Sequence, residues 1–144
     1  MDKEVDVDEA LRFAAENNML EVVQYFLNAG YDSRIAFSAA LRRRNFDILQ
    51  ACLEVGAPCG EVFLAAVREE DFAIVKLCVK YATTYQGEAL KLAMKQRHMS
   101  IADILLDNKA DRTPALDFAD SFANKYDTSY ITAYFMGYDI KVGK

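Results

Sequence analysis

Apolar positions in residues 10–32 follow the period of an α-helix twice, with a polar break between the two runs. Each run has apolar residues three, four or seven positions apart: Leu11, Ala14 and Ala15 in the first, and Leu20, Val23 and Leu27 in the second. Between them, Asn17 and Asn18 favour a tight turn, because asparagine tolerates the left-handed backbone conformation. Gly30 follows the second run, where a left-handed helix cap is expected. The pattern predicts a hairpin of two short helices.

The same pattern recurs along the chain. The first column contains Leu11, Phe37, Phe63, Leu90 and Leu116, separated by 26, 26, 27 and 26 residues. A second column contains only alanine: Ala14, Ala40, Ala66, Ala93 and Ala119. Single apolar matches are common by chance in a chain that is 53% hydrophobic, but several columns in register are not. One hairpin cannot bury its apolar side alone, so the copies are expected to stack. The predicted copies span residues 10–35, 36–61, 62–88, 89–114 and 115–144.

These copies resemble the ankyrin repeat family over roughly residues 10 to 139. The resemblance is carried by AAENNMLEVVQYFLNAGYD, NFDILQACLEVGAP and MSIADILLDNKADRTPA. It implies an all-α fold, an α-solenoid of about five stacked helix-turn-helix repeats in one domain over residues 1–144. The copies are shorter than the family repeat of roughly 33 residues, so they leave no room for its projecting β-hairpin. The residues in place of the turn glycine are Asn18, Arg44, Glu70 and Arg97. A left-handed residue other than glycine costs about 1 kcal/mol, so these turns could be rebuilt in another conformation.

Basic residues recur where the first helix of a copy ends. Arg42, Arg68 and Lys95 occupy one column, and Arg43 adjoins the first of them. Stacking would align the column as a strip that docks an acidic partner or a phosphate backbone. The alternative is that these cations only offset the dipole at the carboxyl end of each helix.

A second candidate surface is the column that holds Phe13, Leu92 and Phe118. The ankyrin resemblance implies that this column faces the concave surface, where clustered apolar residues usually mark a binding site. The alternative is that the shortened repeats pack more tightly and bury these side chains.

Tyrosines recur every four residues in the last copy, at Tyr126, Tyr130, Tyr134 and Tyr138. On a helix they form a ridge that could cap the end of the stack, as repeat proteins require. The ridge could equally be a binding patch, because tyrosine is enriched at interface hot spots. Replacing Tyr130 and Tyr134 with alanine would separate the two hypotheses.

Composition favours a cytoplasmic protein with no membrane partner. The 22 acidic against 17 basic residues argue against a general nucleic-acid binder. Residues 1–9 carry no apolar run of the signal-peptide type, and no apolar stretch approaches the length of a membrane span. Cys52 and Cys78 share a core column and predict buried thiols in a reducing compartment, whereas Cys59 is expected to lie in a loop with no catalytic role.

No pattern in the chain indicates catalysis, a cofactor or a metal. His98 is the only histidine and falls in a predicted turn, and there is no Cys/His pair with metal-ligand spacing and no glycine-rich phosphate loop. We therefore expect a non-enzyme that binds another protein, and the resemblance suggests a viral or bacterial modulator of a host protein.

Two alternative functions remain open. The first is an acidic inhibitor of a nucleic-acid-binding protein, acting through the acids of the first nine residues: Asp2, Glu4, Asp6, Asp8 and Glu9. The second is a structural protein that forms a homo-oligomer through the tyrosine ridge.

Overall fold

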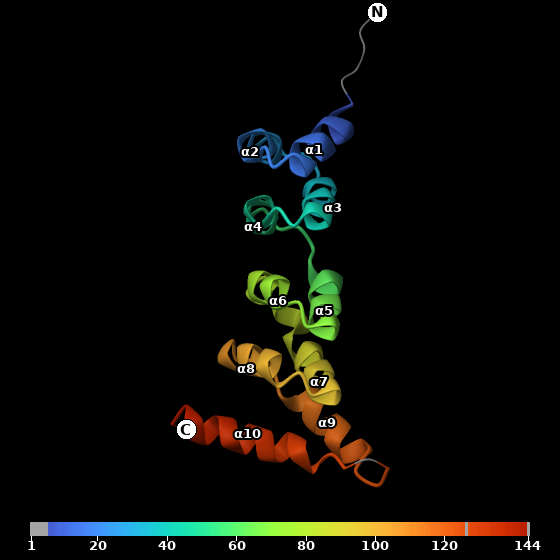
Figure 1. The fold of residues 1–144 in the computed structure, drawn as a ribbon, viewed down its shortest axis with the longest axis vertical. Coiled ribbons are helices and arrows are strands. Elements are labelled where there is room, and N and C mark those ends of the chain that lie inside the picture. The colour runs from blue at the N-terminus through green and yellow to red at the C-terminus, as the bar shows by residue number, and fades with distance from the viewer. Residues whose placement is uncertain (1–5, 126, 144) are drawn as a thin grey trace, which may run out of the picture. The chain divides into compact units, whose positions relative to one another are not determined.

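The computed structural model describes residues 6–125 and 127–143, which form ten α-helices, one 3-10 helix and no strand (Figure 1). The all-α prediction is therefore confirmed for these residues. Contacts divide the chain into two compact units, residues 1–58 (unit 1) and 59–144 (unit 2), and each is described by itself. The single domain over residues 1–144 remains a prediction. No helix among the described residues is both long and apolar enough to cross a bilayer.

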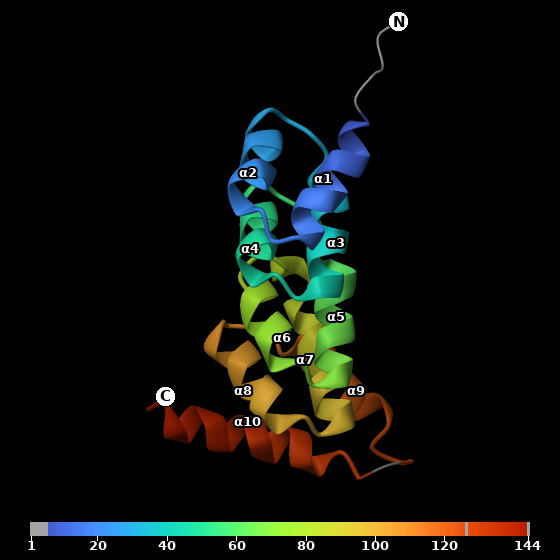
Figure 2. The ribbon, with the colours of Figure 1, turned by 45° about the horizontal axis from the view of Figure 1, so that its top comes forward.

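Unit 1 consists of two helical hairpins, one layered on the other (Figures 1 and 2). Its helices are α1 (Val7–Glu16), α2 (Leu20–Asn28), α3 (Ser33–Arg43) and α4 (Phe46–Glu54). The first helices of the two hairpins pack on each other (α1 on α3), and so do the second helices (α2 on α4). The core between the layers is formed by buried apolar side chains: Leu11, Ala15, Val23, Leu27, Ala36, Ala40, Ile48 and Cys52. Asn45 Nδ2 also donates a hydrogen bond across the layers to the Ala15 carbonyl, at 2.7 Å.

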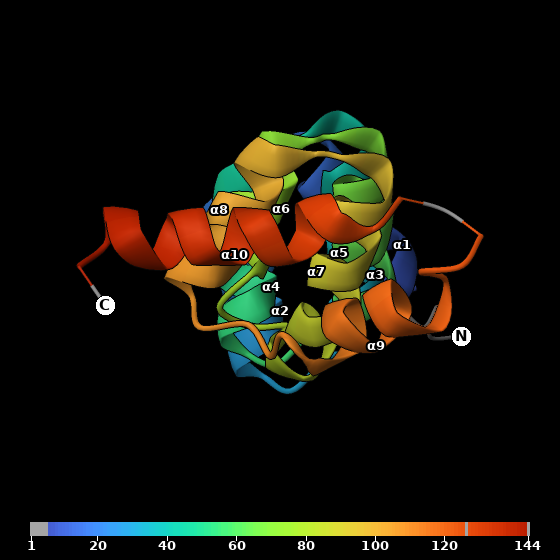
Figure 3. The same ribbon diagram turned by 90° about the horizontal axis from the view of Figure 1, so that it is seen from below.

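Unit 2 repeats this arrangement. Its helices are α5 (Gly60–Glu69), α6 (Phe72–Cys78), the 3-10 helix η1 (Thr83–Tyr85), α7 (Gln86–Gln96), α8 (Met99–Asp107), α9 (Thr113–Ser121) and α10 (Ser129–Lys141). α7 packs between α5 and α9, and α6 packs on α8. His98 holds the position that corresponds to Asn45, and its Nδ1 lies 3.0 Å from the Val67 carbonyl. Because a carbonyl can only accept, this nitrogen carries the proton. Figure 3 shows α10 crossing beneath α7 and α8.

Four of the hairpins turn in the same way, next to the alanine column. Asn18, Arg44, Glu70 and Arg97 all have left-handed backbones, with φ between 56° and 59°. In each case the next residue donates its N–H to the alanine carbonyl five residues earlier, at 2.8 to 2.9 Å. This is the hydrogen bond of a left-handed helix cap, which satisfies a carbonyl that the helix leaves unpaired. The turns are therefore not rebuilt, and they keep the left-handed conformation without glycine.

The last copy turns differently. The Ala119 carbonyl accepts its hydrogen bond from the Thr128 hydroxyl, at 2.8 Å, instead of from a backbone N–H. A buried side chain thus replaces the left-handed turn residue, because the connection between α9 and α10 is longer than in the other copies.

The helix ends are capped by side chains and by left-handed residues. Asp6 caps α1 by accepting the Glu9 N–H at 3.2 Å. A left-handed cap occurs at Gly30, as predicted, and its equivalents Gly56 and Lys109 are also left-handed, with φ from 63° to 95°, but the third copy departs from the pattern. There Ala82 has φ −101° and η1 follows, so the chain enters α7 through a 3-10 turn.

Candidate binding site

An open cleft of about 400 Å³ lies in unit 2, where the carboxyl end of α7 meets α9 and the start of α10. Its lining comes from all three elements and the loop before α10: Lys95, Arg97, Phe118, Phe122, Asp127, Thr128 and Tyr130. Lys95 and Arg97 lie at the end of α7 because the left-handed turn at Arg97 stops that helix. Phe118 lies in α9, and Phe122 is the residue that caps the carboxyl end of that helix. Because they are four residues apart, both side chains lie on the same face.

Cations lie over aromatic rings in this cleft. Lys95 Nζ is 5.1 Å from the centre of the Phe118 ring, and the Arg97 guanidinium carbon is 3.8 Å from that of Tyr130. Both distances fall within the range of cation–π attraction. Such an attraction contributes about 0.5–1 kcal/mol at exposed sites. Phe118 and Phe122 stand with ring centres 5.1 Å apart and form the apolar wall.

The other side of the cleft is held in place by hydrogen bonds. The Tyr130 hydroxyl donates to the Met94 carbonyl at 2.7 Å, which fixes the ring under Arg97. The Asp127 carboxylate accepts from Ser129 Oγ at 2.6 Å and Ser129 N at 3.1 Å. These bonds, together with the charge of Arg97, lower the pKa of Asp127. The cleft therefore contains two cations and one carboxylate on a rigid aromatic frame.

This arrangement supports non-covalent recognition. The aromatic wall can cover an apolar side chain, while Lys95 and the outer face of Arg97 can bind an acidic group beside it. No cluster of three or more His, Cys, Asp and Glu side chains among the described residues could hold a metal ion. His98, the only histidine, is engaged between layers, with Nε2 3.7 Å from Glu70.

Three of the residues predicted from sequence meet in the cleft, namely Lys95, Phe118 and Tyr130. Sequence reasoning did not select Arg97 and Phe122. Phe122 could have been found from its four-residue spacing to Phe118. Arg97 was identified only as a turn residue, because its place over the Tyr130 ring depends on how α10 packs against α7.

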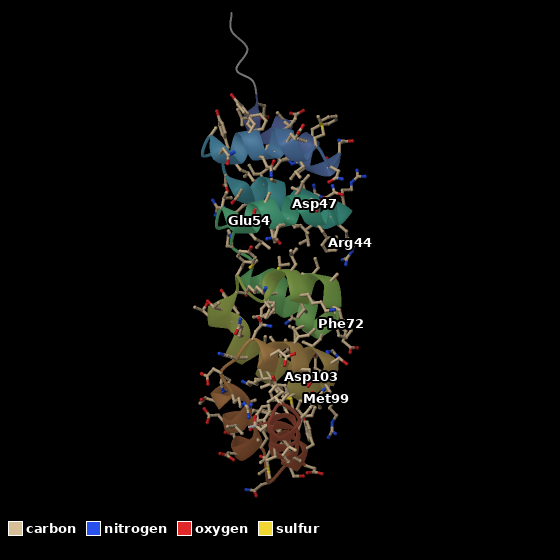
Figure 4. All side chains as sticks on the ribbon, turned by 90° about the vertical axis from the view of Figure 1, so that its left-hand side faces the viewer. Arg44, Asp47, Glu54, Phe72, Met99 and Asp103 are labelled. Atoms are coloured by element: carbon tan, nitrogen blue, oxygen red, sulfur yellow. The ribbon has the colours of Figure 1, made fainter. Side chains whose placement is uncertain are left out.

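The other predicted residues of unit 2 lie outside the cleft. Leu92 is half-buried on α7, and Arg68 is exposed in the last turn of α5. Tyr134 faces α8, where its hydroxyl lies 2.9 Å from the Met99 carbonyl and donates to the Asp103 carboxylate. Figure 4 labels Met99 and Asp103 on that helix.

The tyrosine ridge packs on unit 2 itself. Tyr138 donates to Asp107 Oδ1 at 2.5 Å, which adds to the bonds of Tyr130 and Tyr134 with α7 and α8. Arg112 and Asp139 form a two-pronged ion pair at 2.7 and 3.0 Å that ties α10 to the start of α9. These contacts favour the cap interpretation of the ridge. Tyr126 lies outside the described residues.

In unit 1, Phe13 is 60% exposed on α1, whereas Ala39, in the same column, is 1% exposed. The Phe13 column is therefore not one continuous exposed surface. Arg42 and Arg43 lie in the last turn of α3. Arg42 Nη2 donates to Glu16 Oε2 at 2.8 Å, and this bond is the main cause that lowers the pKa of Glu16.

All three thiols are buried, including that of Cys59, which was expected to lie in a loop. Cys52, Cys59 and Cys78 are all buried and free. Cys59 precedes α5 and contacts Cys78, so it is not isolated in a loop, and the pKa of Cys78 is raised by the hydrogen bond to Cys59 and by burial.

Of the acids at the amino terminus, Asp6, Asp8 and Glu9 are exposed. Asp2 and Glu4 lie outside the described residues.

No protein-family model matches the chain, and neither a curated protein nor a solved structure matches it.

Proposed function

We propose that this chain is a non-catalytic protein-binding module built from ankyrin-like helical repeats in an α-solenoid. The recurring left-handed turn and the layering within each unit support the repeat assignment. We further propose that the unit 2 cleft binds a partner segment with an acidic group next to an apolar side chain. The buried, free thiols support a cytoplasmic setting, where such groups stay reduced.

The observation that carries this function is the fixed aromatic and cationic frame around Lys95, Arg97 and Phe118. Tyr130 and Thr128 are each bonded to a backbone carbonyl, at 2.7 and 2.8 Å. Side chains that are already ordered lose little conformational entropy on binding, which favours affinity. An exposed frame with cations on aromatic rings suits non-covalent recognition.

A display library of random peptides, selected against the full chain, tests this function. Acidic peptides with an apolar or aromatic residue beside the acid should be enriched. Lys95→Glu should weaken their binding about fivefold to tenfold, because it reverses a charge at the site. Phe118→Ala should weaken it about tenfold, as the loss of an aromatic anchor does.

Matched controls lie outside the cleft in the same unit. Lys80→Glu makes the same charge change at an exposed position, and Phe72→Ala removes a partly exposed ring on α6. Both should leave affinity within about twofold. The proposal fails if no peptide is enriched, or if the enriched peptides bind the cleft variants as tightly as the unaltered chain.

A further inference from the structure

A second hollow lies in unit 1, on the side of α1 and α2 that faces away from α3 and α4. Its volume is about 590 Å³. Two acids, Asp6 and Glu9, line it together with six apolar residues: Ala10, Phe13, Ala14, Met19, Val22 and Phe26. Phe13, Met19 and Val22 are 60%, 39% and 37% exposed. Large apolar side chains gathered in a groove usually mark a surface that a partner covers.

The repeat register shows what kind of object covers such a face. Ala39 and Ile48 are the equivalents of Phe13 and Val22 one copy later, and they are 1% and 0% exposed. Since α1 packs on α3 and α2 on α4, a pair of helices covers these positions in the second copy. The same face of the first copy thus has the form of a helix-binding surface.

The face is not shaped for another layer of the same kind. Phe13 stands where the second copy has Ala39, and a ring there would overpack a closely stacked hairpin. Met19 stands where Asn45 donates its interlayer hydrogen bond to Ala15 at 2.7 Å, and a thioether has no donor. An occupant must therefore rest on the Phe13 ring and the Met19 side chain instead of reproducing the layer contacts.

Charge indicates the character of the occupant. Among the described residues, the ionisable side chains in the lining are the carboxylates of Glu9, on α1, and of Asp6, which caps that helix. Two copies joined through this face would bring carboxylates into one interface, where like charges repel. A partner that carries cations beside its apolar stripe complements the face.

We propose that the outer face of α1 and α2 is a docking groove for a basic amphipathic helix of a partner protein. Leucine-sized side chains at i, i+3, i+4 and i+7 of that helix pack on Phe13, Met19 and Val22. Its lysines or arginines face Asp6 and Glu9. This site lies in unit 1 and does not depend on the cleft in unit 2.

The test uses the full chain and three synthetic peptides. One is an amphipathic leucine–lysine helix, the second replaces its lysines by glutamates, and the third scrambles the leucine–lysine order. Binding is measured by fluorescence anisotropy at physiological salt. The leucine–lysine helix should bind at least about tenfold more tightly than either of the others, because both the stripe and the charge are required.

Variants then place the peptide. Phe13→Ala should weaken the leucine–lysine helix about tenfold, and Glu9→Lys about fivefold. The controls are Tyr25→Ala, which removes a ring that is 71% exposed on α2, and Glu21→Lys, which reverses an exposed acid on that helix. Neither control residue lines the groove, so each should change affinity less than twofold, about the level of a neutral contact.

Methyl NMR gives an independent readout. Peptide addition should shift the methyl resonances of Met19 and Val22 and leave that of Met136, on α10, in place. Equal weakening by the groove variants and their controls would overturn the proposal, as would shifts at Met136 alone. A concentration-dependent dimer that Phe13→Ala dissociates would assign the face to a second copy, and would also overturn it. Because the cleft residue Lys95 is not altered, these failures are distinct from failure of the proposed function.

Discussion

Tyr134 provides the sharpest test of how α10 is attached. Its hydroxyl donates to the Asp103 carboxylate and lies 2.9 Å from the Met99 carbonyl. Tyr134→Phe removes this hydroxyl and keeps the ring. Tyr134→Ala removes both and leaves a gap between α10 and α8.

The expected magnitudes follow from these contacts. A hydrogen bond to a charged group contributes about 1.5–3 kcal/mol, and Asp103 is only half-buried, so its carboxylate can regain water. We therefore expect Tyr134→Phe to lower the free energy of unfolding by about 1 kcal/mol. Removal of a fully buried aromatic ring lowers the free energy of unfolding by about 3–5 kcal/mol. The ring of Tyr134 is half-buried, so Tyr134→Ala should lower it by about 2–3 kcal/mol.

Thermal unfolding followed by circular dichroism measures the effect. For a chain of this size, 1 kcal/mol corresponds to about 3–4 °C in Tm. Hydrogen exchange should locate the loss, with faster exchange of the α8 and α10 amides and unchanged exchange in α1 to α4. Tyr25→Phe, at a side chain that is 71% exposed, is the matched control and should leave Tm unchanged.

An unchanged Tm in Tyr134→Ala would contradict this attachment of α10. In that case α10 does not stabilise unit 2, and loss of partner binding by the same variant would identify the tyrosine ridge as a binding patch. A melting temperature that falls in both variants while partner binding persists would establish the cap.

Four further predictions concern stability and thiol reactivity. Burial and the bond to Asp103 raise the pKa of Tyr134, and the bond to Asp107 raises the pKa of Tyr138 to about 12. The free energy of unfolding should therefore be unchanged below pH 10 and fall as the pH rises toward 12. Urea unfolding at several pH values should show this fall, and the fall should be shallower in Tyr134→Phe. Glu70→Gly should raise the free energy of unfolding by about 0.5–1 kcal/mol in urea titrations, because Glu70 has φ 57° and glycine adopts that region without steric cost. Gly60→Ala should lower Tm, because a Cβ there would collide with the Tyr85 ring, and Tyr85→Ala in the same chain should restore part of the loss. The three buried thiols should react with a disulfide reagent only after the chain is unfolded; rapid reaction of the folded chain would contradict their burial.

The helices and the positions of their turns were predictable because they depend on near neighbours. The spacing of the alanine column indicated where each first helix ends, and Asn18, Arg44, Glu70 and Arg97 all proved left-handed. Each of these turns is closed by a hydrogen bond spanning five residues, so its cause lies within the repeat. Asp6 was missed as the cap of α1 because several acids precede that helix, and composition alone does not choose among them.

The unit 2 cleft was predictable only in part. Lys95 and Phe118 were selected as separate candidates from different columns. Their meeting depends on the packing of α7 against α9, and the cleft is closed by Tyr130, whose hydroxyl bonds to Met94, 36 residues earlier. Contacts over that separation leave no periodic trace in the sequence.

The recurring helical hairpin could be read from the chain alone, since apolar spacing acts over a few residues. Packing between hairpins, in contrast, sets whether the side chains of a column are buried or exposed. Phe13 is exposed and Ala39 is buried at equivalent positions, because a neighbouring hairpin covers one and not the other. Exposure is a property of what lies across the interface, and binding surfaces are defined by exposure. The two candidate surfaces of this protein therefore arise from packing.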